Sequence, residues 1–439
     1  MFNIMKKLLA RKIAAFIALT TFPFCCLHAQ KIPSPAFVGY WETWGTMKLT
    51  QINPAYNVID IAFAVTKDSS LYDMELAPFS NYTKAEFMSD IDALHALKKV
   101  VILSIGGAND PVYLDSPTQK SIFVSSMNKI LTDYGDKFDG IDIDLEGLSI
   151  KQFAGSWTMT APVIQQQYLI DGIKQILTDY KTRTGKKLLL TMAPETYYVQ
   201  GGLSSGQISG AGGAGYLPII EALKDDIDML HCQLYNAYSN IAIDGKEYKE
   251  GTGDFLVAMT ETVIKGFTVL NGKGVFSGLP ADRVGIGLPA CSGAGYVTPD
   301  IVCQAIKYIR GAISKPVNWK YTLTKPYPEM TCVMTWNVND DAKCSNTFAS
   351  INSCAFLGVG IQENNESNSF NIYPNPAVDR LTMETTTNTP MFICITNVLG
   401  KVVLEKQFTQ IKTEIDISLL PTGIYIIHAN NFAQKFIKQ

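Results

Sequence analysis

Residues 138–145, FDGIDIDL, are the stretch from which the fold of this chain can be deduced. Its apolar residues share one parity: Ile141, Ile143 and Leu145. The acidic residues share the other parity, which continues past the stretch: Asp142, Asp144 and Glu146. Successive side chains of a strand point to opposite faces, and alternate ones lie about 6.5–7 Å apart. The stretch therefore predicts a strand with one face packed against apolar neighbours and a row of carboxylates on the other.

Similar apolar runs recur on both sides of this strand. They are FVGYW (37–41), VIDIAFAV (58–65), VVILSIG (100–106), KLLLTMA (187–193), DMLHCQLY (228–235), RVGIGLP (283–289) and TCVMTW (331–336). Apolar residues at helical spacing lie between them, for example over 123–134 and 169–180. Strands that alternate with helices form parallel sheets covered on both faces. Eight such units in about 320 residues predict an α/β fold, a TIM (β/α)8 barrel.

A doubly wound open sheet is the alternative to the barrel. Its dinucleotide-binding members carry a glycine fingerprint directly after the first strand. No such fingerprint follows residues 37–41, so the barrel is favoured.

Both ends of the chain differ from this pattern. Residues 1–29 carry four basic side chains, no acidic ones and a short apolar run, which is typical of a cleaved signal peptide. The barrel is expected over 30–358, followed by a polar linker over 359–369. Residues 370–439 alternate short strands with turn signals and predict a small all-β sandwich domain.

Composition and charge exclude several functions. The chain has 439 residues, 47% of them hydrophobic and 18% charged, as in a globular protein. Its net charge is −3, or −7 without the first 29 residues. The sequence contains no block of basic residues, so a nucleic-acid partner is not expected. Histidines and cysteines are scattered without metal-ligand spacing, so we expect no metal and no cofactor. A disulfide between Cys344 and Cys354 would close a short loop, and reduced buried thiols are the alternative.

Proton chemistry is the favoured use of the acidic row. Three carboxylates inside a barrel repel one another, so at least one should keep a proton near neutral pH. Glu146 is nearest the carboxyl end of its strand, where barrels of this class carry their active sites. There it could donate a proton to a leaving-group oxygen. A Mg²⁺ or Ca²⁺ site and a purely structural row remain as alternatives.

The residues of this strand resemble a known motif. Residues 139–146, DGIDIDLE, match the DxxDxDxE motif of glycoside hydrolase family 18, the chitinases and related endo-N-acetylglucosaminidases. Segments resembling other family motifs follow in the expected order: SIGG (104–107), MAPE (192–195), QLYN (233–236) and Trp336 at the eighth strand. The QLYN segment is similar to the hevamine-like, bacterial branch. The resemblance covers residue 37 to about 357 and implies a TIM barrel.

The resemblance also implies roles for single residues. Glu146 would be the general acid and then the base. Asp144 would hold the substrate's acetamido N–H, and Asp142 would share a proton with Asp144. Tyr235 would hydrogen-bond the acetamido oxygen, which attacks the anomeric carbon in a retaining, substrate-assisted mechanism. Glu195 is the alternative, as a carboxylate nucleophile.

Substrate binding is assigned to a second group of residues. Trp336 would form the floor under the sugar, and Gln233 and Asn236 would line the acetamido pocket. Further expected contacts are Met192, Tyr40 and Phe63. Aromatic residues at strand ends are candidates for sugar stacking: Trp41, Trp44, Tyr197 and Tyr198. His231 shares the parity of Gln233 and is expected to be a hydrogen-bonded core histidine.

The family resemblance leaves three functions open. A chitinase is favoured, with chitin or N-acetylglucosamine oligosaccharides as its partners. An endo-β-N-acetylglucosaminidase acting on N-glycan cores and a non-catalytic lectin are the alternatives. Only about 40 residues (290–329) separate the last two strands, so the α+β insertion of processive chitinases is expected to be absent. An open groove and endo cleavage follow from that.

The C-terminal domain resembles the sorting domain of type IX secretion in Bacteroidetes. The similar segments are YPNP (373–376), VLGK (398–401), LPTGIY (420–425) and KFIK (435–438). A chitin-binding module is the alternative. The resemblance implies the type IX machinery as a partner and a route through the periplasm to the outside. No stable membrane insertion is expected.

Overall fold

The computed structural model describes residues 31–68, 70–153, 157–356, 370–385, 391–397, 402–408, 410–429 and 432–439. The expected signal peptide and the expected linker, with their boundaries, lie outside these residues. The part between them and the C-terminal segment are described in turn.

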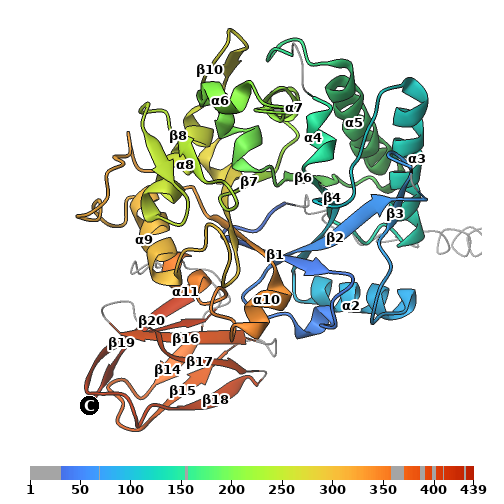
Figure 1. The fold of residues 1–439 in the computed structure, drawn as a ribbon. Helices are drawn as coiled ribbons and strands as arrows, with labels where there is room; N and C mark the ends of the chain where they lie inside the picture. Colours follow the sequence, from blue (N-terminus) through green and yellow to red (C-terminus); the bar gives the residue numbers. More distant parts are fainter. Residues whose placement is uncertain are drawn as a thin grey trace, which may run out of the picture.

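Parallel strands close into a barrel between residues 36 and 336 (Figure 1). The strands are β1 (Ala36–Glu42), β2 (Val58–Thr66), β4 (Val100–Gly107), β5 (Gly140–Leu145), β6 (Leu189–Met192), β7 (Met229–Gln233), β12 (Val284–Pro289) and β13 (Cys332–Trp336). Each pairs in parallel with the next, and β1 pairs with both β2 and β13, which closes the sheet. A short antiparallel strand, β3 (Met74–Leu76), extends β2. All eight predicted strands and the predicted TIM barrel are confirmed.

Helices surround the barrel in Figure 1. They are α2 (Lys84–Ala96), α3 (Pro117–Asp133), α5 (Ile164–Thr184), α7 (Leu217–Leu223), α8 (Gly253–Lys265), α9 (Pro299–Ile309), α10 (Val338–Lys343) and α11 (Ile351–Phe356). The helices expected over 123–134 and 169–180 correspond to α3 and α5. One prediction is wrong: β1 and β2 are joined without an α-helix, by a loop containing only the 3-10 turn η1 (Leu49–Gln51). Pro54 lies in this short loop and cannot continue a helix.

Two apolar layers hold the barrel together. The larger lies between the strands and the helices and includes Ile141, Ile143 and Leu145. The smaller fills the barrel interior with residues such as Val38 and Ile102. Since the interior is packed, substrate can reach only the carboxyl ends of the strands and the loops that follow them.

Two disulfides join the last units of the barrel. Cys291, in the loop after β12, bonds to Cys344 at the end of α10. Cys303 of α9 bonds to Cys354 of α11. The guess of a Cys344–Cys354 disulfide is therefore wrong, because barrel closure brings each of these cysteines to a partner about fifty residues earlier in the sequence.

The C-terminal segment, orange to red in Figure 1, forms two antiparallel sheets. The first contains β14 (Asn371–Tyr373), β15 (Arg380–Glu384) and β18 (Lys412–Asp416). The second contains β16 (Met391–Asn397), β17 (Val402–Phe408), β19 (Gly423–Ala429) and β20 (Phe432–Lys438). Side chains of both sheets share one apolar core, including Leu381, Ile415, Ile393, Ile427 and Phe436. The predicted all-β sandwich is confirmed. Among the described helices, none has the length and apolar character needed to cross a membrane.

Candidate active site

The carboxylate row of β5 points into the barrel, as its parity predicts. Asp142 is fully buried, and Asp144 is 2% exposed. Glu146 follows the strand's last residue, at the carboxyl end of the barrel. Tyr216 fixes this end of the strand, because its hydroxyl accepts a hydrogen bond from the Leu145 N–H at 2.7 Å.

Asp142 is held by hydroxyl groups from three other strands. Its Oδ2 accepts hydrogen bonds from Tyr40 of β1 at 2.6 Å and from Ser104 of β4 at 2.7 Å. Its Oδ1 accepts one from Thr191 of β6 at 2.7 Å. These three hydrogen bonds satisfy both oxygens of the buried carboxyl and fix its position in the barrel interior.

Gln233 of β7 bridges the other two carboxylates. Its Nε2 donates to Oδ1 of Asp144 and to Oε1 of Glu146, both at 2.9 Å. Burial, followed by the charges of Glu146 and Asp142, raises the pKa of Asp144 well above its usual range. Burial also raises the pKa of Glu146, although hydrogen bonds with Gln233 and Asp144 oppose the shift. The pair therefore retains a proton at a pH where an exposed carboxyl would have lost it, which is what a general acid requires.

Two glycines of β4 make room for the site. At Gly107, which has φ of +80°, a Cβ would lie 2.7 Å from the ring of Phe63. At Gly106, with φ of +104°, a Cβ would lie 2.7 Å from the carbonyl oxygen of Asp144. Both positions need a residue without a side chain. The SIGG segment thus matters here for its backbone, and Ser104 for its hydroxyl.

An aromatic floor lies beside the carboxylates. We use this name for Trp44, Phe63 and Trp336. Phe63 and Trp336 stack with ring centroids 5.7 Å apart and an interplanar angle of 11°. Trp44 lies 6.2 Å from Phe63 and 6.5 Å from Trp336, and it is 48% exposed. Trp44 and the partly exposed Trp336 can stack on the apolar face of a sugar, whereas Phe63 is 6% exposed and supports Trp336 from below the surface.

Three of the residues considered for sugar contacts are buried in this structure, and their contacts with substrate stay predictions. Met192 has the opposite parity to Thr191 and is fully buried in the layer between strands and helices. Trp41 is likewise fully buried on the outer side of the barrel. Tyr40 is 1% exposed beneath Trp336, and its hydroxyl is used by Asp142, so it positions a carboxylate.

Tyr235 and Asn236 follow β7 at the same end of the barrel. Burial and the charges of Asp144, Glu146 and Glu195 raise the pKa of Tyr235 well above its ordinary value. Its hydroxyl therefore stays protonated and can donate a hydrogen bond. Asn236 has an exposed side chain and a left-handed backbone with φ of +52°. Their contacts with substrate stay predictions.

Glu195 makes folding stability depend on pH. Burial and the charge of Glu146 raise its pKa to about 7 from an ordinary 4.5. Because the folded protein binds this proton more tightly than the unfolded chain, the stabilisation is complete below pH 4.5 and is lost as pH rises through 7. We expect at most about 3 kcal/mol from this group. Melting temperatures of wild type and Glu195→Gln between pH 4.5 and 8 test this. The variant should give the flatter curve, and parallel curves would contradict the assignment.

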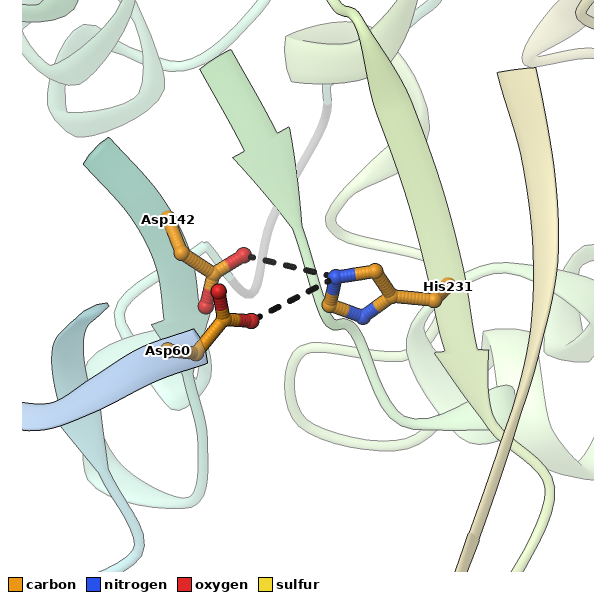
Figure 2. A group of neighbouring side chains, drawn as sticks. All are labelled: Asp60, Asp142 and His231. Carbon is orange, nitrogen blue, oxygen red and sulfur yellow. Dashed lines mark ion pairs between the residues drawn. The ribbon is translucent and has the colours of Figure 1, made fainter. Parts of the chain in front are cut away.

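The amino-acid sequence alone does not identify every residue of the site. It assigns no role to Thr191, Tyr216 or Asp60, although Asp60 stands out as an acidic residue inside the apolar run 58–65. His231 is predicted to be hydrogen-bonded. Figure 2 shows that Asp60 and Asp142 instead face one ring nitrogen of His231, and neither nitrogen has a hydrogen-bond partner within the described barrel.

Comparison with known proteins agrees with this geometry. The model of glycosyl hydrolases family 18 matches residues 36–262, and that of the secretion system C-terminal sorting domain matches residues 371–439. Chitinase Chi52 of Paenibacillus xylanexedens is 35% identical over 83% of this chain and 70% of its own length. Chitinase D of Niallia circulans is 37% identical over 75% of this chain and 63% of its own length.

Solved structures give the same result. A family GH18 chitinase from Chromobacterium violaceum is 33% identical and has a TM-score of 0.64, over 74% of this chain and 85% of the other. The barrel with its carboxylate row is therefore a glycosidase domain, a C-terminal sorting domain follows it, and the chain belongs to glycosyl hydrolase family 18.

Proposed function

We propose that this protein is a secreted chitinase that hydrolyses β-1,4-linked N-acetylglucosamine polymers by a retaining, substrate-assisted mechanism. The observation that carries the proposal is the pair of carboxyls, Asp144 and Glu146, bridged by Gln233 at the carboxyl end of the barrel. Burial raises the pKa of both carboxyls, so we infer that the pair keeps one proton. Glycosidic cleavage needs one acid beside the leaving oxygen. Glu146 is that acid, because it is the outermost of the row.

The substrate's own acetamido group then supplies the nucleophile. Asp144 accepts the acetamido N–H and orients the acetamido oxygen toward the anomeric carbon, and the hydroxyl of Tyr235 donates to that oxygen. When Glu146 takes the shared proton, Asp144 is left as the carboxylate that accepts the acetamido N–H. Asp142, held by three hydroxyl donors, lies one alternate position below it on the same face of the strand. The intermediate is a cyclic oxazolinium ion. Glu146, now deprotonated, activates the water that opens it with retention.

The aromatic floor supports a pyranose as substrate. Trp336 and Phe63 form a stacked surface next to the acid row, and the exposed Trp44 extends it. The names of the relatives favour chitin over N-glycan cores, since Chi52 and Chitinase D are both chitinases.

Hydrolysis of chitin oligomers compared with a high-mannose glycoprotein separates the candidate substrates. We expect release of N-acetylglucosamine oligomers from chitin and no deglycosylation of the glycoprotein. The reverse pattern would identify an endo-β-N-acetylglucosaminidase. Binding of chitin oligomers without any hydrolysis would identify a lectin.

Endo cleavage is the expected mode on polymer. The described chain between β12 and β13 contains a single helix, α9, so one wall of the groove stays low. Relatives carry both kinds of name: Endochitinase 4 of Metarhizium robertsii and Exochitinase 1 of Streptomyces olivaceoviridis. We expect mixed tri- to hexasaccharides at the earliest times of colloidal chitin digestion. Disaccharide as the main early product would contradict an endo mode.

Export and catalysis should be separable. Type IX sorting domains address proteins to a secretion machinery, and the sandwich has its own apolar core. A chain ending near residue 360 should hydrolyse chitin oligomers at the full-length rate but accumulate in the periplasm. Cell fractionation and activity of the purified truncation measure both. Loss of hydrolysis would mean that the sandwich supports the barrel or binds polymer.

A further inference from the structure

Asp60 and His231 face each other in the barrel interior, next to Asp142 (Figure 2). Both are fully buried. Nε2 of His231 lies 3.7 Å from Oδ2 of Asp60 and 4.0 Å from Oδ1 of Asp142. Both carboxylate oxygens of Asp60 and both ring nitrogens of His231 lack a hydrogen-bond partner among the described residues. A buried polar group without a partner costs about 1–3 kcal/mol, so these two residues are not explained by stability.

Among the described residues, no basic side chain forms an ion pair with this pair. The ring of Tyr40 from β1 meets the His231 ring edge-on at 6.3 Å, and the Tyr40 hydroxyl is bonded to Asp142. Cys332 of β13 lies nearby, and burial with the charge of Asp60 raises the pKa of its thiol. Within the described chain, no lysine or arginine forms an ion pair with Asp60 or His231. A proton is therefore the available source of positive charge for this cluster among the described residues.

Electrostatics favour a proton on Asp60 over a proton on His231. Burial, then the negative charge of Asp142, raises the pKa of Asp60 well above its usual range. Burial lowers the pKa of His231, while Asp142 opposes that shift. Protonated Asp60 beside neutral His231, and the ion pair that results when the proton moves to the ring, have the same net charge of zero. The 3.7 Å gap is too short to hold a water between the two groups and is close enough for a small side-chain shift to complete a hydrogen bond.

We propose that Asp60 and His231 share one proton and act as a positioning pair that adjusts the charge beneath Asp142 as pH changes. The inference rests on the proposed glycosidase function. At low pH the pair takes up a second proton and becomes positive, which opposes proton uptake by the carboxyl row beside it. At high pH it loses its proton and becomes negative, which helps Glu146 to keep the catalytic proton. The pair thus widens the pH range of activity from both sides without touching substrate.

Two isosteric variants separate these effects. Asp60→Asn cannot become negative, so the basic limb of the kcat–pH profile should move to lower pH. His231→Asn cannot become positive, so the acidic limb should move to higher pH. The pair lies about 4 Å from Asp142, so we expect the acidic limb to shift by about 0.5–1 pH unit. Glu146 lies two alternate strand positions further out, about 13 Å from Asp142, so the basic limb should shift less, by up to about 0.5 pH unit. The double variant should narrow the profile from both sides, and KM for a soluble chitin oligomer should change less than about twofold in all three.

Tyr56→Phe is the matched structural control. It removes a hydroxyl that donates to buried Asp341 at 2.6 Å, outside the barrel interior. This variant should lower the melting temperature and leave both limbs in place. If Asp60→Asn and His231→Asn also lower the melting temperature without moving either limb of the pH profile, the pair is structural and the proposal is overturned.

The proposal can also be tested on the wild-type protein, in case the variants fail to fold. The ring ¹⁵N chemical shifts of His231, followed from pH 4 to 9, should report proton uptake at low pH in the full chain. Constant shifts of a neutral ring would overturn the proposal.

A metal ion is the competing explanation. The donor atoms of Asp60, Asp142 and His231 lie within 4.8 Å of one another, but a structural metal centre takes four ligands, and the Asp142 oxygens already accept three hydroxyls. One equivalent of metal per purified chain, lost in Asp60→Asn, would overturn the shared proton. The proposed function is tested separately, because an active Glu146→Gln protein would contradict glycosidase chemistry at this row whatever the limb shifts show.

Discussion

Replacing Glu146 by Gln should lower kcat for chitin oligomers by about 10³-fold, within the 10²–10⁴ range of general acid–base catalysis. The amide cannot donate the proton that the leaving sugar oxygen needs. Its oxygen can still accept the hydrogen bond from Gln233, so the fold should be kept. Initial rates of oligomer hydrolysis, with melting temperature as a check on folding, measure the effect.

The choice of leaving group tests what Glu146 does. The 4-nitrophenolate of a 4-nitrophenyl glycoside departs without being protonated, whereas a sugar leaving group needs a proton. The rate of the first step should therefore fall much less in Glu146→Gln with the nitrophenyl glycoside than with a chitin oligomer. The basic limb of the pH profile should also disappear. Equal losses on both substrates, or an active variant on chitin oligomers, would show that Glu146 is not the acid.

Asp144→Asn should lower kcat by about 10²–10³-fold, because a neutral amide can neither hold the charge that develops on the acetamido group nor take part in proton sharing with Glu146. Glu195→Gln is the matched control, since Glu195 is a second carboxyl near Glu146 with a raised pKa. If the acetamido oxygen is the nucleophile, Glu195→Gln should lose less than about tenfold.

Two further observations distinguish the nucleophiles. Chitosan oligomers, which lack the acetamido carbonyl, should be hydrolysed at least 10²-fold more slowly than chitin oligomers by the wild-type protein. Azide should restore no activity to either variant. A severe loss in Glu195→Gln that azide rescues would instead identify Glu195 as a covalent nucleophile and exclude the substrate-assisted route.

The acidic strand was predictable because its chemistry is local. Side-chain alternation along one strand places Asp142 and Asp144 on one face whatever the rest of the chain does. The eight strands and the C-terminal sandwich follow in the same way from runs of apolar residues and turn signals. Met192 shows the limit of motif matching, since it lies inside a matching segment but has the outward parity.

The partners of these residues depend on strands that are distant in sequence. Tyr40, Ser104 and Thr191 meet at Asp142 only because the sheet closes, and Gln233 reaches Asp144 across the barrel interior. The disulfides were misjudged for the same reason, as sequence distance is a poor guide to proximity once helices α9 and α11 are packed together.

Strand periodicity and the burial of apolar faces act within a few residues, so the barrel, the sandwich and the acid row could be predicted from the sequence. The charges and hydrogen-bond donors around that row come from distant strands and are known only from the folded chain. The pKa of a buried carboxyl depends on the charges and donors that surround it in space. For Asp144 these include Gln233 of β7 and Glu195, which follows β6.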